Sequence, residues 1–187
     1  MIKQQQAELE GKALVSTILF DHKSLVLHDR LPLEKIEPLT EKDYEVRGTT
    51  ALLDAVGDAV KHIKNIHKYA REEDRPQKTL FVITTDGMEN SSINYDYNQV
   101  KRLVEQQKEK GWEFIFLGAN IDAVKVAGHI GIDARRAVNY HADSQGTEHV
   151  FGAINDFMQA FSSGGGVDIP DDVWRKLIDQ DFKERKK

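Results

Sequence analysis

The stretch Phe-Val-Ile-Thr-Thr-Asp-Gly at residues 81–87 decides the fold class, because an apolar run ends there in a polar turn. Thr79–Thr84 predicts a strand covered on both faces, since such strands are short, nearly continuous apolar runs rich in β-branched residues. Asp86 and Gly87 form a turn at the carboxyl end of this strand. Three further segments are predicted as strands: Ala13–Phe20, Glu113–Leu117 and Arg136–Tyr140.

Segments with helical periodicity separate these strands. Apolar residues from Leu52 to Ile66 recur at the spacing of one helix face, which predicts a helix ending at about His67. Ser, Thr and Asp are common helix N-caps, and they mark where the other helices should start. The expected starts are Thr49 or Thr50, Ser91 or Ser92, Asp122, and about Thr147 for a helix ending near Phe161.

Strands that alternate with helices predict an α/β fold, because parallel strands need crossover connections. We expect three layers: a doubly wound, mostly parallel sheet with helices on both faces. Ser24–His28 can return beside Ala13–Phe20 as an antiparallel edge strand. Residues 29–48 are polar and contain two prolines, so we predict a long surface connection there.

The chain fits one domain with a small addition. Residues 1–163 are expected to form the α/β domain. The glycines at 164–166 open a linker, predicted over residues 164–170. Residues 171–187 are expected to hold a short amphipathic helix, Asp171–Phe182, and a basic tail.

Composition excludes several classes of protein. The formal net charge of −5 argues against nucleic acid, whose phosphates select for clustered Lys and Arg. No cysteine is present, which excludes disulfides and thiolate chemistry and favours the cytoplasm. The longest apolar run, Ala13–Phe20, is too short to cross a bilayer, and the beginning of the chain does not resemble a secretion signal.

Polar side chains gather where the predicted strands end. In doubly wound sheets, ligands bind at the carboxyl ends of the strands, near the point where strand order reverses. This places a candidate site at Asp21, Thr84–Asn90 and Gly118–Asp122, with Thr49 and Thr50 on the neighbouring loop.

Two motifs, in this order and on this pattern, resemble the von Willebrand factor A-type (vWA) family. Arg47–Leu52 (Arg-Gly-Thr-Thr-Ala-Leu) is similar to its Gly-(Gly/Ser)-Thr loop opening a helix. Residues 81–87 are similar to its apolar strand ending in Thr-Asp-Gly. The resemblance covers roughly residues 1–161. It implies a Rossmann-like fold that binds partner proteins and is not an enzyme.

The resemblance also implies a metal-ion-dependent adhesion site (MIDAS) for Mg²⁺ or Mn²⁺. Carried over to this chain, the metal ligands are Thr50 and Asp86, and an Asp or Glu carboxylate of the partner would complete the coordination. Mg²⁺ prefers six oxygen ligands and keeps several waters, which suits these residue types. The surrounding rim would be Thr49, Gly87, Glu89 and Asn120.

The chain departs from the family at its beginning. No Asp-x-Ser-x-Ser occurs, and Lys3–Leu9 is predicted as only the tail of the helix that follows this motif in the family. We expect an N-terminally truncated fold, or one that naturally lacks the strand, with weak or no metal binding. The absent strand would be central. Ala13–Phe20 should therefore pair directly with Thr79–Thr84 or recruit a strand from a neighbour, and self-association through exposed edges is expected.

Other functions stay open on the sequence alone. A metal-dependent hydrolase using Asp86 is the second hypothesis, and a non-functional fragment or split domain is the third. Simpler structural roles are also available: Thr50 as a helix N-cap and Asp86-Gly87 as a turn. Glu89, Asn90 and Asn120 are interpreted as solvated loop residues, and the histidines form no ligand set.

Overall fold

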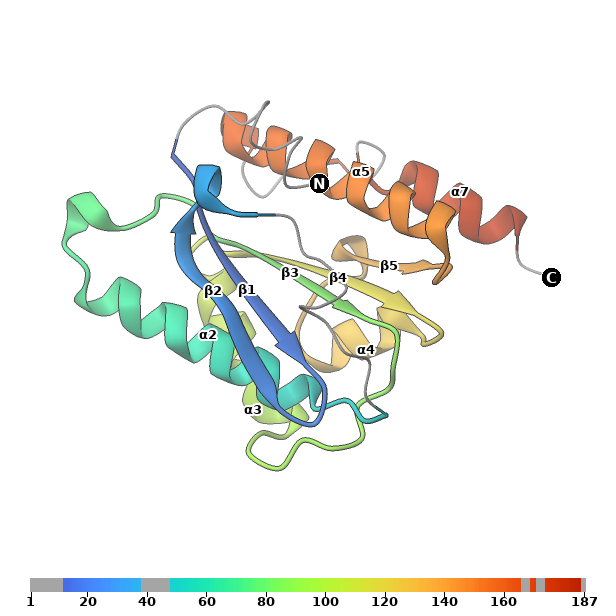
Figure 1. Cartoon of the computed structure of the whole chain (residues 1–187), viewed down its shortest axis with the longest axis horizontal. Helices are drawn as coiled ribbons and strands as arrows, with labels where there is room; N and C mark the ends of the chain where they lie inside the picture. The colour runs from blue at the N-terminus through green and yellow to red at the C-terminus, as the bar shows by residue number, and fades with distance from the viewer. Residues whose placement is uncertain (1–11, 38–47, 166–168, 171–173, 186–187) are drawn as a thin grey trace.

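The structure, a computed structural model, describes residues 12–37, 48–165, 169–170 and 174–185 (Figure 1). It is an α/β fold, as expected, but its strands form two sheets. One is an antiparallel pair and the other is a parallel sheet of three strands in the order β3-β4-β5. The strands are β1 (Leu14–Phe20), β2 (Ser24–Pro32), β3 (Leu80–Thr85), β4 (Glu113–Ala119) and β5 (Ala137–Tyr140).

Helices follow the strands in the order expected for crossover connections. The α-helices are α2 (Leu52–Tyr69), α3 (Tyr97–Lys108), α4 (Ala123–His129), α5 (Ser144–Ala160) and α7 (Lys176–Glu184). Short 3₁₀ turns are η1 (Leu33–Lys35), η2 (Glu72–Asp74) and η3 (Ala134–Arg136), and a wider turn, η4 (Phe161–Gly165), follows α5.

The strand β4 lies at the centre of the three-stranded sheet, and all seven of its residues are buried. Its side chains alternate between two apolar clusters. Phe116 packs with residues of α2, α3 and α4, whereas Leu117 packs with residues of α5 and α7. Figure 1 shows these two groups of helices on opposite faces of the sheet. The predicted three-layer arrangement is therefore found around this sheet.

The predicted single sheet is not found among the described residues. There β1 pairs only with β2, and β3 pairs only with β4. The direct pairing of Ala13–Phe20 with Thr79–Thr84, one of the two outcomes expected for a fold without its central strand, does not occur. The edge strand at Ser24–His28 is confirmed and continues to Pro32, so the predicted surface connection begins later. Residues 38–47 of that connection, and Lys3–Leu9, lie outside the described part of the chain.

Two helix starts differ from the predictions for a local reason. The predicted start at Ser91 or Ser92 is wrong: α3 begins at Tyr97, after Asp96 and Gln99 form a reciprocal capping box. The predicted start at about Thr147 is also wrong. There α5 begins at Ser144, because the Asp143 carboxylate accepts a hydrogen bond from the Gly146 amide.

The helix near the C-terminus belongs to the same core as β4. Trp174 and Ile178 are buried in the cluster that contains Leu117. Arg185 pairs with the carboxylates of Asp181 and Asp143, which fixes the end of α7 beside the start of α5. Residues 171–173, the predicted start of this helix, lie outside the described residues. No helix in the described part of the chain has the length and apolar character needed to cross a bilayer.

Candidate functional site

The carboxyl ends of β1 and β3 meet at the residues that lead into α2. The Ala51 amide donates a 2.6 Å hydrogen bond to the carbonyl oxygen of Asp21, just after β1. On the other side, a Cβ atom added to Gly87 would lie 2.7 Å from the Thr50 hydroxyl oxygen, which is closer than atoms can approach. Glycine at position 87 therefore allows Thr50 to lie against the turn after β3. Thr50 and Gly87, both predicted site residues, are brought together.

A pair of hydrogen bonds ties Thr50 to the loop that follows β3. The Thr50 amide donates to the Asn90 side-chain oxygen at 2.8 Å, and the Asn90 amide donates to the Thr50 carbonyl oxygen at 3.0 Å. Asn90 is thus a structural part of this rim and more than the solvated loop residue expected from the sequence.

The first amides of α2 are capped by residues far away in the sequence. Ala51 occupies the N-cap position and makes no side-chain cap, so the prediction that Thr49 or Thr50 caps the helix is wrong. Glu89 Oε2 accepts a hydrogen bond from the Leu53 amide at 2.9 Å, and Ser92 Oγ accepts one from the Asp54 amide at 3.1 Å. The helix start is therefore satisfied only when the loop after β3 is in place.

Glu89 is half-buried and accepts four hydrogen bonds, which contradicts its interpretation as a solvated loop residue. Besides the Leu53 amide, its donors are the Ser91 and Ser92 amides and the Ser92 hydroxyl, the last at 2.7 Å. Burial alone would raise the pKa of the Glu89 carboxyl, but these hydrogen bonds outweigh burial and hold the pKa below its usual range. Glu89 is therefore ionised at neutral pH and organises its own loop.

Asp54, in the first turn of α2, is a site residue that the sequence analysis missed. Its side chain is buried and accepts hydrogen bonds from the amides of Ile93, Asn94 and Tyr95 at 2.9 to 3.0 Å. Burial acts to raise the pKa of Asp54, and these bonds lower it by more, so the net shift is downward. An acid in the first helical turn is common, so the sequence carries no signal of these long-range contacts.

Together these bonds give the loop after β3 an ordered backbone. Every amide from Asn90 to Tyr95 donates to Thr50, Glu89 or Asp54. Residues 86–95, which we call the rim loop, nevertheless expose two apolar side chains: Met88 is 70% exposed and Ile93 is 89% exposed. Loops of soluble proteins are usually mobile, so an ordered loop that presents apolar side chains to solvent is unusual.

The remaining predicted residues lie on the same edge without bonds to one another. Asp86 is exposed and makes no hydrogen bond or ion pair with any described residue. Thr49 is also exposed. Asn120 follows β4 with a φ of 57°, in the left-handed region that Asn tolerates better than most residues. Because Thr85 is paired with Gly118, Asn120 lies at the same end of the sheet as Asp86.

These residues do not fit a complete site for Mg²⁺. The described chain contains no group of three or more His, Asp or Glu side chains placed to hold a metal ion. The Thr50 hydroxyl and the Asp86 carboxylate supply two of the six oxygens that Mg²⁺ prefers.

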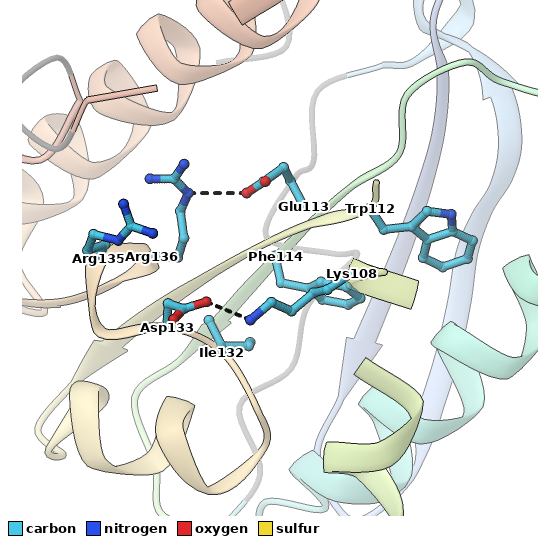
Figure 2. A pocket seen from close by; sticks show the side chains of 8 residues that line it. All are labelled: Lys108, Trp112, Glu113, Phe114, Ile132, Asp133, Arg135 and Arg136. Atoms are coloured by element: carbon cyan, nitrogen blue, oxygen red, sulfur yellow. Dashed lines mark hydrogen bonds and ion pairs between the residues drawn. The ribbon is translucent and has the colours of Figure 1, made fainter. Parts of the chain in front are cut away.

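Figure 2 shows a pocket at the opposite end of the three-stranded sheet, where β4 and β5 begin. Its volume is about 100 Å³. Four of the five charged side chains that line it are paired with one another: Arg136 with Glu113 at 3.1 Å and Lys108 with Asp133 at 2.6 Å. Small-molecule pockets usually measure about 300–1,000 Å³. This pocket is too small and too internally paired to be the candidate site.

Comparisons with protein-family models, with curated proteins and with solved structures found no match to this chain. The relation to vWA domains therefore rests on the two sequence motifs and stays a hypothesis.

Proposed function

We propose that this chain is a protein-interaction module of the vWA type whose partner binds at the rim loop. The observation that supports this most directly is the exposure of Met88 and Ile93 on a loop whose backbone amides are all engaged from Asn90 to Tyr95. Asp86 lies in the same loop, and its carboxylate makes no hydrogen bond or ion pair with any described residue.

An ordered loop binds at a lower entropic cost than a mobile one, because little conformational freedom remains to be lost. Met88 and Ile93 can each transfer a large apolar surface from water to a partner, which favours binding by about 25 cal/mol per Å² buried. Met side chains also adapt to irregular surfaces. The proposed partner therefore has an apolar pocket for these two residues and a polar group for Asp86.

The surroundings of Asp86 do not favour catalysis. A general base must lie within hydrogen-bonding reach of the group that it activates, and Asp86 has no such neighbour among the described residues. Metal binding is also a minor part of the proposal, because Thr50 and Asp86 supply too few oxygens. The polar contact to the partner is assigned to the Asp86 carboxylate itself.

A capture experiment with matched variants tests the proposal. Wild-type protein, the double variant Met88→Ser/Ile93→Ser and the control Leu177→Ser would be immobilised and exposed to the same cell extract. Leu177 is also an exposed apolar residue, at 63%, but it lies on α7 away from the rim loop. We expect the double variant to lose specific partners by about tenfold or more, and the control to retain them.

Equal capture by all three proteins would contradict the proposal. Turnover of phosphate or ester substrates with Mn²⁺ that disappears in Asp86→Ala would instead support a metal-dependent hydrolase.

A further inference from the structure

We infer that the partner of the rim loop is a basic protein surface, which places Lys or Arg side chains around its apolar contact with the loop. This inference rests on the proposed function and adds the charge of the partner to it. The exposed side chains of Met88 and Ile93 supply the apolar contact. The charges of the rim loop and of the start of α2, to which the loop is bonded, indicate the chemistry of the partner.

The two segments that form this surface contain acids and no bases. Residues 48–60, which lead into α2, and residues 79–100, which include the rim loop, contain no Lys, Arg or His, although the whole chain has 26 Lys and Arg residues. The same two segments contain five acids: Asp54, Asp58, Asp86, Glu89 and Asp96. The local charge is therefore strongly negative.

All five carboxylates lie in the rim loop or beside it. Asp86 and Glu89 belong to the loop, and Asp96 follows it as the N-cap of α3. Asp54 accepts hydrogen bonds from three amides of the loop, and Asp58 accepts one from the hydroxyl of its last residue at 3.1 Å. Three of the five, Asp58, Asp86 and Asp96, are exposed and can therefore contact a partner.

The negative charge of this surface is not balanced within the described part of the chain. None of the five carboxylates forms an ion pair with a described residue. The donors to the two inner carboxylates are amides and a hydroxyl, which carry no formal charge. At the other end of the sheet, by contrast, Figure 2 shows Glu113 paired with Arg136 and Asp133 paired with Lys108.

Two tyrosines respond to the negative charge of the rim. Burial raises the pKa of Tyr95, and the Asp58 carboxylate raises it further by accepting a hydrogen bond from the Tyr95 hydroxyl. Burial also raises the pKa of Tyr97, the first residue of α3, and the charge of Glu89 adds to this effect. Because nearby negative charge makes a phenol harder to deprotonate, both shifts agree with a negative field at the rim.

A basic partner fits this surface better than the alternatives. A second copy that docked through the same surface would place like charges opposite one another, which opposes association. Phosphates of nucleic acids and anionic lipids would be repelled for the same reason. A carboxylate on the partner would meet Asp86 directly, since Thr50 and Asp86 supply too few oxygens to hold Mg²⁺ between them. Lys and Arg side chains can neutralise the exposed acids while their apolar stems cover Met88 and Ile93.

Selection from a library tests the charge of the partner. A synthetic library of single-domain antibodies, whose randomised loops contain acidic and basic residues in equal proportion, would be selected on the wild-type protein. Clones that also bind Met88→Ser/Ile93→Ser would be discarded, so that the remaining clones depend on the apolar contact. We expect Lys and Arg to outnumber Asp and Glu in the loops of these clones by about threefold or more.

Charge-neutralising variants test the contribution of the acids directly. Asp58→Asn/Asp86→Asn removes two exposed charges, and an Asn oxygen at position 58 can still accept the hydrogen bond from Tyr95. Glu72→Gln/Asp74→Asn is the matched control, because both residues are exposed in η2, after the other end of α2. We expect the first variant to weaken binding of the selected clones by about tenfold at low salt, and the control by less than about twofold. Thermal unfolding shows whether each variant remains folded.

Three results would overturn the inference. The first is a set of clones that depend on Met88 and Ile93 but carry neutral or acidic loops, which would leave the proposed function intact. The second is equal binding of the selected clones to the Asp58→Asn/Asp86→Asn variant and to its control. The third is self-association of the free protein that Met88→Ser/Ile93→Ser abolishes in sedimentation experiments, because the occupant of the rim would then be a second copy. A selection without any clone that depends on Met88 and Ile93 would contradict the proposed function together with this inference.

Discussion

The strands β1 and β4 are both mostly apolar but have different surroundings. Both are seven-residue strands with a mostly apolar sequence, yet β4 is buried along its whole length and β1 contains no fully buried residue. In β4, strands pair on both edges and helices cover both faces. In β1, a strand pairs on one edge, and α2 packs against one end. The burial of a strand thus depends on the strands and helices beside it. An apolar sequence indicates only that the strand needs such neighbours.

The largest expected effect is the difference in stability loss between alanine substitutions at two phenylalanines, one in β4 and one in β1. Phe116 of β4 is completely buried, so Phe116→Ala should lower the free energy of unfolding by about 4 kcal/mol. Phe20 of β1 is only partly buried, and Phe20→Ala should cost about 1 to 2 kcal/mol. Urea unfolding measures both values. Equal losses would mean that β1 is covered in solution as fully as β4.

A second prediction concerns the hydrogen bonds that connect α2, beside β1, to the loop after β3. Asp54 joins α2, which covers β1, to the loop after β3 through three amide hydrogen bonds. Removal of the carboxylate leaves these amides without their partner, so Asp54→Ala should cost about 2 to 3 kcal/mol.

The control for this prediction is Asp58→Ala, on the same helix. Asp58 is exposed and accepts one hydrogen bond, from the Tyr95 hydroxyl at 3.1 Å. Its loss should cost less than about 1 kcal/mol. Similar losses in the two variants would show that the contacts of Asp54 do not hold the regions together.

The stability that the Asp54 and Glu89 carboxylates supply to this connection should depend on pH. The pKa values of Asp54 and Glu89 are lowered in the folded state. Their stabilisation is therefore complete above the usual carboxyl pKa of about 4, and it is lost as the pH falls through the lowered values. Thermal unfolding from pH 7 to pH 3 should show a steeper loss for wild type than for Asp54→Asn/Glu89→Gln. Parallel profiles would contradict this account.

The smallest expected effect is at the predicted metal ligand. Asp86 is exposed and makes no bond with any described residue, so Asp86→Ala should change the free energy of unfolding by less than about 0.5 kcal/mol. A loss of about 2 kcal/mol or more would indicate that Asp86 supports the residues before α2 through contacts that form in solution. The same urea titrations used for Phe116→Ala measure it.

The sequence predicts the parts of this fold that depend on local pattern. The apolar runs around Leu80–Thr85 and Glu113–Ala119 are strands, and Asp122 caps α4 through the Lys125 amide, as expected. The split into two sheets was not predicted, because strand pairing depends on residues distant in the sequence. For the same reason, the sequence assigned α2 a threonine cap, whereas Glu89 supplies it from across the fold.

In the candidate site, too, the sequence predicts the features set by local motifs and misses those set by distant residues. Thr50 and Gly87 were predicted from the two motifs and lie in contact range. The roles of Asp54 and Glu89 were missed, since each depends on several amides that approach only in the folded chain. A single carboxylate in a sequence does not indicate how many donors will surround it.

The engaged amides of the rim loop also bear on how this chain would respond to proteases. A protease must draw about ten residues of substrate into an extended form, and exposed loops with large apolar residues are ordinarily its first targets. Here extension of residues 90–95 requires that Asp54 and Glu89 release their amides, and that the start of α2 lose its cap. Cleavage beside Met88 or Ile93 would then proceed only through local unfolding, at a rate set by the stability of the helix start.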